Sequence, residues 1–218
     1  MTIENQLEKL IYGRENRANV LLLCYASTAG SINKMKELEC SLKFSLERNI
    51  VTEKECYEAL LQIYLFAGFP AAIESLSVLN SVANDKTYKN SQVHYTIDLF
   101  RYRGEELCKR VYTTAYYKMR KKLHGISPEL DEWMIIEGYG KTLSRSGLSS
   151  KTRELITASS LAALGWENQL FSHIRGAISV GSNHEECFEL LEVLTLLCSI
   201  DVINRTKIII ENVVHSKL

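Results

Sequence analysis

The residues best suited to acid–base chemistry lie in the stretch that ends at His173 and includes the carboxylate of Glu154. Ser149 or Ser150 is placed to cap a helix that carries Glu154 in its first turns. Gly165 is placed to end that helix in a left-handed conformation. A second helix returning beside the first would bring the two side chains together, so the stretch predicts a carboxylate against an imidazole in a closed pocket.

The second helix is expected to begin at Trp166. Trp166, Gln169 and His173 are separated by three and four residues, so they share one face of this helix. Competing structural roles remain open for each residue. A histidine in a helix is often a packing residue, Glu154 could simply favour the positive end of its helix, and Trp166 could belong to the core.

The elements that must position these residues are predicted to be helices. The chain has 218 residues, of which 46% are hydrophobic, and it contains 2 prolines and 11 glycines. Most apolar residues recur at spacings of three and four, which is typical of amphipathic helices. The length suits one large domain or two small ones, and the predicted fold class is all-α.

The charge balance argues against nucleic acid and anionic membranes as partners. Lys plus Arg and Asp plus Glu each total 26, so no overall field attracts a polyanion. Apolar runs such as Val20 to Ala26 are too short to span a bilayer, and the first residues lack the pattern of a secretion signal. We therefore expect a cytoplasmic protein that does not enter a membrane.

The cysteines and histidines do not form a ligand set. The 6 cysteines show no C-x-x-C spacing, and most lie within apolar helical patterns, which predicts buried free thiols. The other histidines fall in linker, helix-end or tail positions, so no metal site is expected. Phosphate-binding glycine loops and G-x-S-x-G elbows are also missing from the sequence, and no cofactor is predicted.

The order of predicted elements occurs twice along the chain. A capping box at Thr52–Glu55 starts a helix that Gly68 and Pro70 interrupt. Matching features return in the second half, where Tyr139-Gly140 echoes Tyr12-Gly13. We predict a first repeat over residues 1–84, a linker and long amphipathic helix over 85–131, and a second repeat over 132–218.

The two repeats differ at the positions that matter for chemistry. In the predicted alignment Leu23 stands opposite Glu154, and Leu42 stands opposite His173. Only the second repeat therefore holds the carboxylate and the imidazole. The first repeat instead keeps the turn around Gly68, so one site is expected to combine the pair of the second repeat with the turn of the first.

Several stretches resemble the carboxymuconolactone decarboxylase family, which has the alkylhydroperoxidase-like helical fold. They are Leu60 to Ala72 in the first half, the Arg103-Gly104-Glu105-Glu106-Leu107 segment, and Arg145 to Ser149, Arg153 to Leu155, Leu161 to Gly165 and His173 to Ala177 in the second half. The resemblance covers nearly the whole chain and implies a duplicated helical bundle. The alkylhydroperoxidase pattern would place two cysteines at Trp166 and Gln169, and both are absent here.

The resemblance implies cofactor-free decarboxylation, or proton transfer, on a small carboxylated lactone or related acid. His173 would donate the proton and Glu154 would orient it. Trp166 and Gln169 would contact the substrate, and its carboxylates would be held by guanidinium groups, for which the candidates are Arg145, Arg153 and Arg175.

Two other functions stay open. One is a non-catalytic helical module that serves oligomerisation, and the other is a thiol-dependent peroxide reductase that uses the dispersed cysteines. Related single-repeat proteins resemble one another in forming rings, so a fused pair implies a homo-oligomer, with a trimer favoured.

Overall fold

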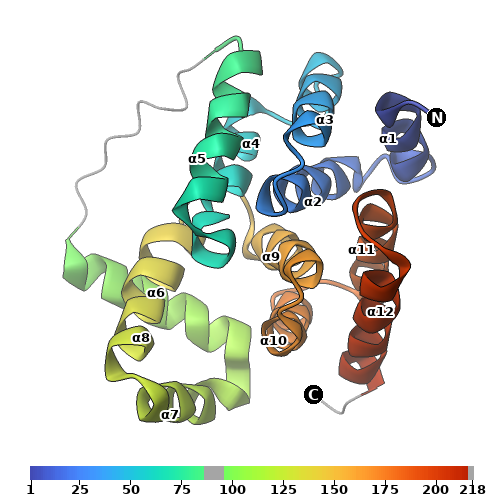
Figure 1. Cartoon of the computed structure of the whole chain (residues 1–218). Helices are drawn as coiled ribbons and strands as arrows, with labels where there is room; N and C mark the ends of the chain where they lie inside the picture. Colours follow the sequence, from blue (N-terminus) through green and yellow to red (C-terminus); the bar gives the residue numbers. More distant parts are fainter. Residues whose placement is uncertain (86–95, 216–218) are drawn as a thin grey trace.

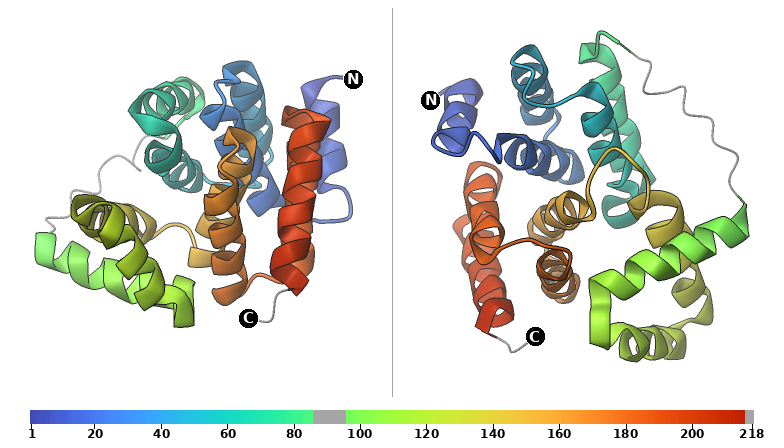
Figure 2. Two further views of the ribbon diagram at one scale, coloured as in Figure 1. Left: turned by 60° about the horizontal axis from the view of Figure 1, so that its bottom comes forward. Right: turned by 180° about the vertical axis from the view of Figure 1, so that it is seen from behind.

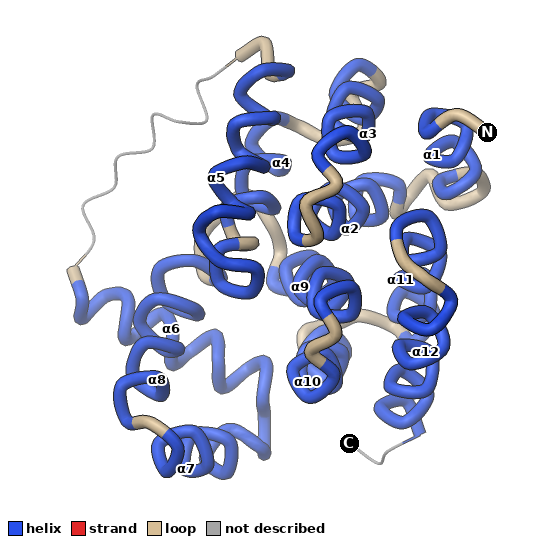
Figure 3. The backbone as a smooth tube through the Cα atoms, in the orientation of Figure 1, coloured by secondary structure: helices blue, strands red, loops and turns tan. Residues whose placement is uncertain are grey.

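The computed structural model describes residues 1–85 and 96–215, and every regular element in these ranges is a helix (Figures 1 and 3). The predicted all-α fold class is therefore confirmed. The first half of the chain contains α1 (Ile3–Ile11), α2 (Ala18–Ser31), α3 (Met35–Glu47), α4 (Glu53–Leu61) and α5 (Tyr64–Val82).

The second half begins with α6 (Ile97–Tyr112), the short 3₁₀ helix η2 (Thr113–Ala115), α7 (Tyr116–Ile126), α8 (Pro128–Trp133) and the π-helix η3 (Met134–Leu143). It continues with α9 (Ser150–Leu164), α10 (Glu167–Ser179), α11 (His184–Leu197) and α12 (Ile200–His215). In both views of Figure 2, α6, α7 and α8 lie together at one side of the molecule, away from α1.

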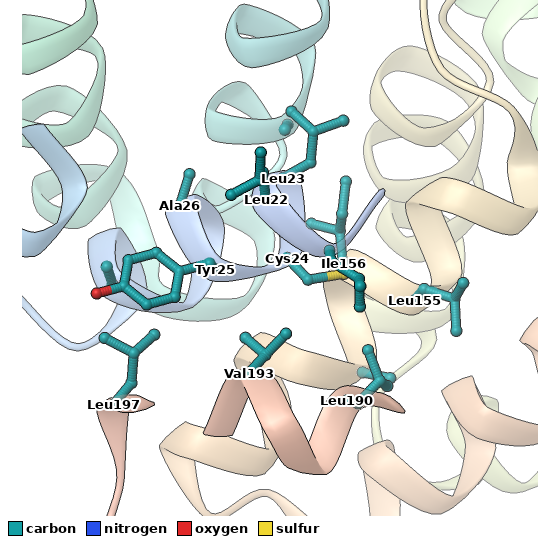
Figure 4. Close-up of a cluster of buried hydrophobic side chains, with 14 of the residues drawn as sticks. Leu22, Leu23, Cys24, Tyr25, Ala26, Leu155, Ile156, Leu190, Val193 and Leu197 are labelled. Atoms are coloured by element: carbon teal, nitrogen blue, oxygen red, sulfur yellow. The ribbon is translucent and has the colours of Figure 1, made fainter. Parts of the chain in front are cut away.

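The core lies where α2 of the first half packs against α9 of the second half, with α11 beneath them (Figure 4). Both central helices are buried along almost their whole length. The hydroxyl groups of Thr28 and Ser159 are 2.7 Å apart at this contact, where neither reaches water. Apolar side chains from the three helices surround this contact, including Leu22, Leu23, Cys24, Leu155, Ile156, Leu190, Val193 and Leu197.

The predicted helix ends are confirmed where they depend on local hydrogen bonding. Thr52 and Glu55 form a complete capping box at the start of α4, and Asn183 with Glu186 forms one at the start of α11. Gly165 ends α9 in the left-handed region, with φ of 79°. A turn with this dihedral favours glycine because it has no Cβ to clash with the backbone.

The prediction of one long amphipathic helix within residues 85–131 is wrong, because α6 and α7 are separate helices. Thr113 has φ of 48° and ψ of −124°, so the chain turns sharply between α6 and α7. The segment is also more than a linker, because α6 packs along η3 in the most extensive helix–helix contact of the described residues. The polar part of the predicted linker between residues 86 and 95 lies outside the described residues.

The equivalence of Tyr12-Gly13 and Tyr139-Gly140 is also wrong in structural terms. Tyr12 is 85% exposed in a turn, whereas Tyr139 is 3% exposed inside η3. The register between the halves shifts as well. If the left-handed residues Asn33 and Gly165 are aligned, Leu22 rather than Leu23 stands opposite Glu154, and Ser41 rather than Leu42 stands opposite His173.

Helix α5 is apolar and interrupted. By length and composition it is the one helix of the described residues that could cross a membrane. Gly68 breaks it, with φ of 84° and ψ of 168°, as the Gly68–Pro70 pattern predicts. The helix that the capping box starts, however, already ends at Leu61, before this break. The regular part after this break spans only ~20 Å, which is shorter than the ~30 Å hydrocarbon core of a bilayer. The interruption therefore weakens the case for a membrane span.

Two glycines allow α6 and η3 to touch backbone to backbone. A Cβ atom on Gly140 would stand 2.0 Å from the carbonyl oxygen of Phe100, and one on Gly104 would stand 2.1 Å from that of Ile135. Neither backbone can move without separating the helices. These contacts fix η3, which forms one wall of the site described below.

We predict that Gly140→Ala lowers the free energy of unfolding by about 3 kcal/mol, because the added methyl group overlaps the α6 backbone. Gly138→Ala in the same helix is the matched control, since nothing lies within 4 Å of its added Cβ. Urea titration followed by circular dichroism measures both. Equal stability of the two variants would contradict the close packing of α6 and η3.

Candidate active site

Glu154 and His173 meet as predicted. The His173 Nδ1 atom lies 2.7 Å from Oε2 of Glu154, and both side chains are buried. Glu154 comes from the first turns of α9, and His173 comes from the middle of α10. Because Nδ1–H donates to the carboxylate, the Nε2 atom is the ring nitrogen left for a ligand.

The carboxylate reaches the imidazole through a gap that glycine leaves in α10. A Cβ atom on Gly176 would stand 2.6 Å from Oε2 of Glu154 and 2.7 Å from a methyl group of Val111 in α6. Gly176 follows His173 by three residues, so both lie on the face of α10 that meets Glu154. The glycine therefore makes room for the buried carboxylate between three helices.

His173 borders a cavity of about 410 Å³ that combines both halves of the chain. Leu65 and Phe66 of α5 enter from the first half, and the Phe66 ring meets the imidazole edge-on with centroids 5.4 Å apart. The two residues lie just before the break at Gly68. The remaining walls come from α6, α7, α8, η3 and α10, including Tyr112, Leu130, Trp133, Met134, Glu137, Tyr139, Leu143 and Gln169.

Two tyrosines give this largely apolar cavity hydrogen-bond donors. Burial raises the pKa of Tyr112, and burial raises the pKa of Tyr139 well above its ordinary value. Both phenols therefore stay protonated at neutral pH. The Tyr139 hydroxyl is fully buried and interacts with the Tyr112 side chain, so the two phenols act as one polar pair at the cavity wall. The sequence analysis named Tyr139 only as the counterpart of Tyr12 and did not predict its place in the cavity. No local sequence pattern indicates the π-helix that buries it.

The predicted substrate contacts are only partly placed at this cavity. Gln169 lines it, one helical turn before His173. Trp166 instead caps the start of α10, is 53% exposed, and does not line the cavity. The expected role of Trp166 as a wall of this site is therefore wrong, because the tight turn at Gly165 directs the residue toward solvent.

Arg145 and Arg153 fasten the two halves together and do not line this cavity. The guanidinium of Arg153 is 1% exposed and donates to Oε2 of Glu58 at 2.8 Å and to Oε1 of Gln62 at 3.0 Å. Arg145 pairs with the same carboxylate at 2.8 Å. Burial lowers the pKa of Arg153, an effect that Glu58 opposes. The prediction that these two arginines hold a substrate carboxylate is therefore wrong.

Arg175 lines a different cavity from the one that His173 borders. It lies on α10 two residues after His173, so it emerges on another side of the helix. It lines a neighbouring cavity together with Tyr112, and not the cavity that His173 borders. Among the residues that the structure describes, no group of three or more His, Cys, Asp and Glu side chains is arranged to hold a metal.

The buried thiols are poorly suited to peroxide chemistry. Burial raises the pKa of Cys56 and of Cys187 to about 12, and it raises the pKa of Cys24 and Cys108 further. A peroxide-reducing cysteine needs an accessible thiolate near neutral pH. These four cysteines therefore provide packing volume.

We predict that Gly176→Ala displaces the Glu154 carboxylate and breaks its contact with His173. The ¹⁵N and ¹H signals of the His173 ring, recorded by NMR, should lose the signature of a hydrogen-bonded Nδ1–H. Gly125→Ala serves as the control, because its added Cβ meets nothing within 4 Å. Unchanged ring signals in the Gly176 variant would mean that the carboxylate does not depend on this gap.

A second prediction concerns stability at alkaline pH. The pKa of Cys56 is about 12 in the folded chain, against about 8.5 for an unfolded thiol. Unfolding therefore releases a proton between these values, and the free energy of unfolding falls by about 1.4 kcal/mol per pH unit from this group. Urea titrations from pH 7 to 11 should show that Cys56→Ala loses this part of the slope. An identical slope in both proteins would contradict the burial of the thiol.

A known protein family matches the part of the chain that holds Glu154 and His173. Residues 128–210 match the model of the carboxymuconolactone decarboxylase family. The matched range runs from α8 into α12 and contains both Glu154 and His173, whereas α1 to α5 lie outside it. A search of curated proteins gave no significant match. Residues 128–210 are therefore a domain of the carboxymuconolactone decarboxylase family, and they carry the buried acid–base pair.

Proposed function

We propose that the protein is a cofactor-free enzyme that removes carbon dioxide from a small carboxylated lactone, or shifts a proton on a related acid. The observation that carries this proposal is the buried contact between Glu154 and His173 at the wall of a cavity. The family match of residues 128–210 supports the same class of reaction.

The chemistry requires a proton donor and a place for negative charge. When the bond to the carboxylate carbon breaks, carbon dioxide leaves and its electron pair moves into the ring carbonyl as a dienolate. Protonated His173 donates from Nε2 to the ring carbon, and the Glu154 carboxylate stabilises the imidazolium before transfer. The imidazole of His173 then takes a new proton from solvent.

The buried phenols suit the developing oxyanion. A neutral phenol in an apolar cavity donates a stronger hydrogen bond than one in water, and it does not compete as a negative charge. Tyr112 and Tyr139 interact with each other, with ring centroids 6.2 Å apart, and together they place a phenol donor at the cavity wall. Gln169 adds an amide donor at the same wall. The cavity therefore offers the enolate oxygen a phenol donor and an amide donor.

We also propose that the chain is a fused pair of helical units. The order of α1 to α5 recurs in η3 and α9 to α12. Arg14 pairs with Glu189 at 3.2 Å, and Arg145 pairs with Glu58 at 2.8 Å. The spacing in the sequence from Arg14 to Arg145 equals the spacing from Glu58 to Glu189. Such reciprocal pairs are what a two-fold interface between duplicated units produces.

Self-assembly is a related proposal. The apolar side chains of Phe69 and Ile73 on α5 are 68% and 58% exposed. A surface of this kind is typical of a face that contacts another copy, and we propose a homo-oligomer, with a trimer favoured. The same surface supports the second candidate function, a helical assembly module without activity. If the protein sediments as a monomer, both the oligomeric enzyme and the inactive assembly module would be contradicted.

We predict that the purified protein releases carbon dioxide from a carboxylated unsaturated lactone, and that His173→Ala lowers this rate about 10²- to 10⁴-fold. Glu154→Gln should lower it as well while leaving the fold intact. The exposed His184 supplies the matched control as His184→Ala, which should keep the full rate.

Peroxide consumption with a thiol reductant is followed in parallel. Carbon dioxide release that survives in His173→Ala would overturn the assigned role of this residue. The absence of carbon dioxide release from a panel of lactones, together with the absence of peroxide consumption, would favour the assembly module.

A further inference from the structure

A second cavity lies beside the one that His173 borders, and the two share the ring of Tyr112. It has a volume of about 280 Å³ and lies between α10 and the α6–α7 corner. Its polar wall contains Lys118 and Lys122 of α7 and Arg175 of α10. The acid–base chemistry proposed above makes no use of this cavity.

The charges around this cavity have one sign. No carboxylate lines it, and the ion pairs of the described residues include none for Lys118, Lys122 or Arg175. Arg120, on the same helix as the two lysines, is by contrast neutralised by Asp131. Lys118 and Lys122 are four residues apart, so their like charges repel on one face of α7. Three cations that line one cavity without a counter-charge favour an anion there.

Apart from Ser172 and Ser179, whose hydroxyls donate to carbonyl groups of their own helix, the rest of the lining is mostly apolar. Met119 and Phe171 contribute thioether and aromatic surface, and Val111 and Ala115 add methyl groups. Burying an apolar group against this lining is favourable. A free inorganic anion has no such group. The cavity therefore combines a recess for an apolar group with cations at its rim.

We propose that this second cavity binds an organic acid with an apolar body. The carboxylate of the ligand pairs with Arg175, whose planar guanidinium matches it in a two-point contact, and with Lys118 and Lys122. The body of the ligand packs against Phe171 and Met119. Because the ligand contacts Tyr112, its binding also constrains a ring that lines the reaction cavity.

The test uses 2-naphthoate as the probe and its neutral isostere 2-naphthamide as the comparison, with binding to the full chain measured by calorimetry. Naphthoate should bind, and the amide should bind at least tenfold more weakly, because it lacks the charge that the cations recognise. Arg175→Gln should weaken naphthoate binding about tenfold or more. Lys121→Ala is the control on α7, since Lys121 does not line the cavity, and it should leave the affinity unchanged.

His173→Ala separates this site from the reaction cavity, because naphthoate binding should survive in that variant whether or not any lactone is decarboxylated. Loss of binding in His173→Ala would place the probe in the reaction cavity and overturn the proposal. Equal affinity for naphthoate and naphthamide would also overturn it. Binding to anionic lipid vesicles that depends on the same three cations, without binding of naphthoate, would assign them to a membrane surface and would equally contradict a small-molecule site.

Discussion

The site depends on how closely α9 and α10 approach each other at Gly176. A carboxylate buried away from water is costly unless a partner compensates it. Here the Glu154 carboxylate fits beside Gly176 and receives the Nδ1–H of His173 at 2.7 Å. That contact fixes which ring nitrogen is free and which way the imidazole faces. The geometry of this pair, and with it the proposed acid–base chemistry, therefore depends on the absence of one Cβ atom.

The remaining walls are held by the packing of the two halves. Glu58 of α4 binds Arg145 and Arg153, which flank the start of α9. Removing one partner of such a buried ion pair is costly, so the pair fixes α4 and α5 against the second half. Phe66 of α5 thereby stays against His173, and the Gly104 and Gly140 contacts keep Tyr139 in place. A cavity built from both halves requires both sets of contacts.

Much of this arrangement follows from local sequence signals. Caps, left-handed glycines and apolar spacing are short-range features, so the start of α4, both ends of α9 and the approach of Glu154 to His173 could be predicted. The π-helix around Tyr139 and the sharp turn at Thr113 could not, because both depend on how α6 packs along η3. The roles of Arg145 and Arg153 were also missed, since their partner Glu58 is remote in the chain.

The most direct test of the acid–base role is decarboxylation of a carboxylated unsaturated lactone in deuterium oxide, with the product examined by NMR. A proton delivered by a fixed imidazole reaches only one face of the ring carbon. We expect carbon dioxide release with a single deuterium on one face of that carbon. Deuterium distributed equally over both faces would mean that solvent, and not His173, protonates the intermediate, and would contradict the account.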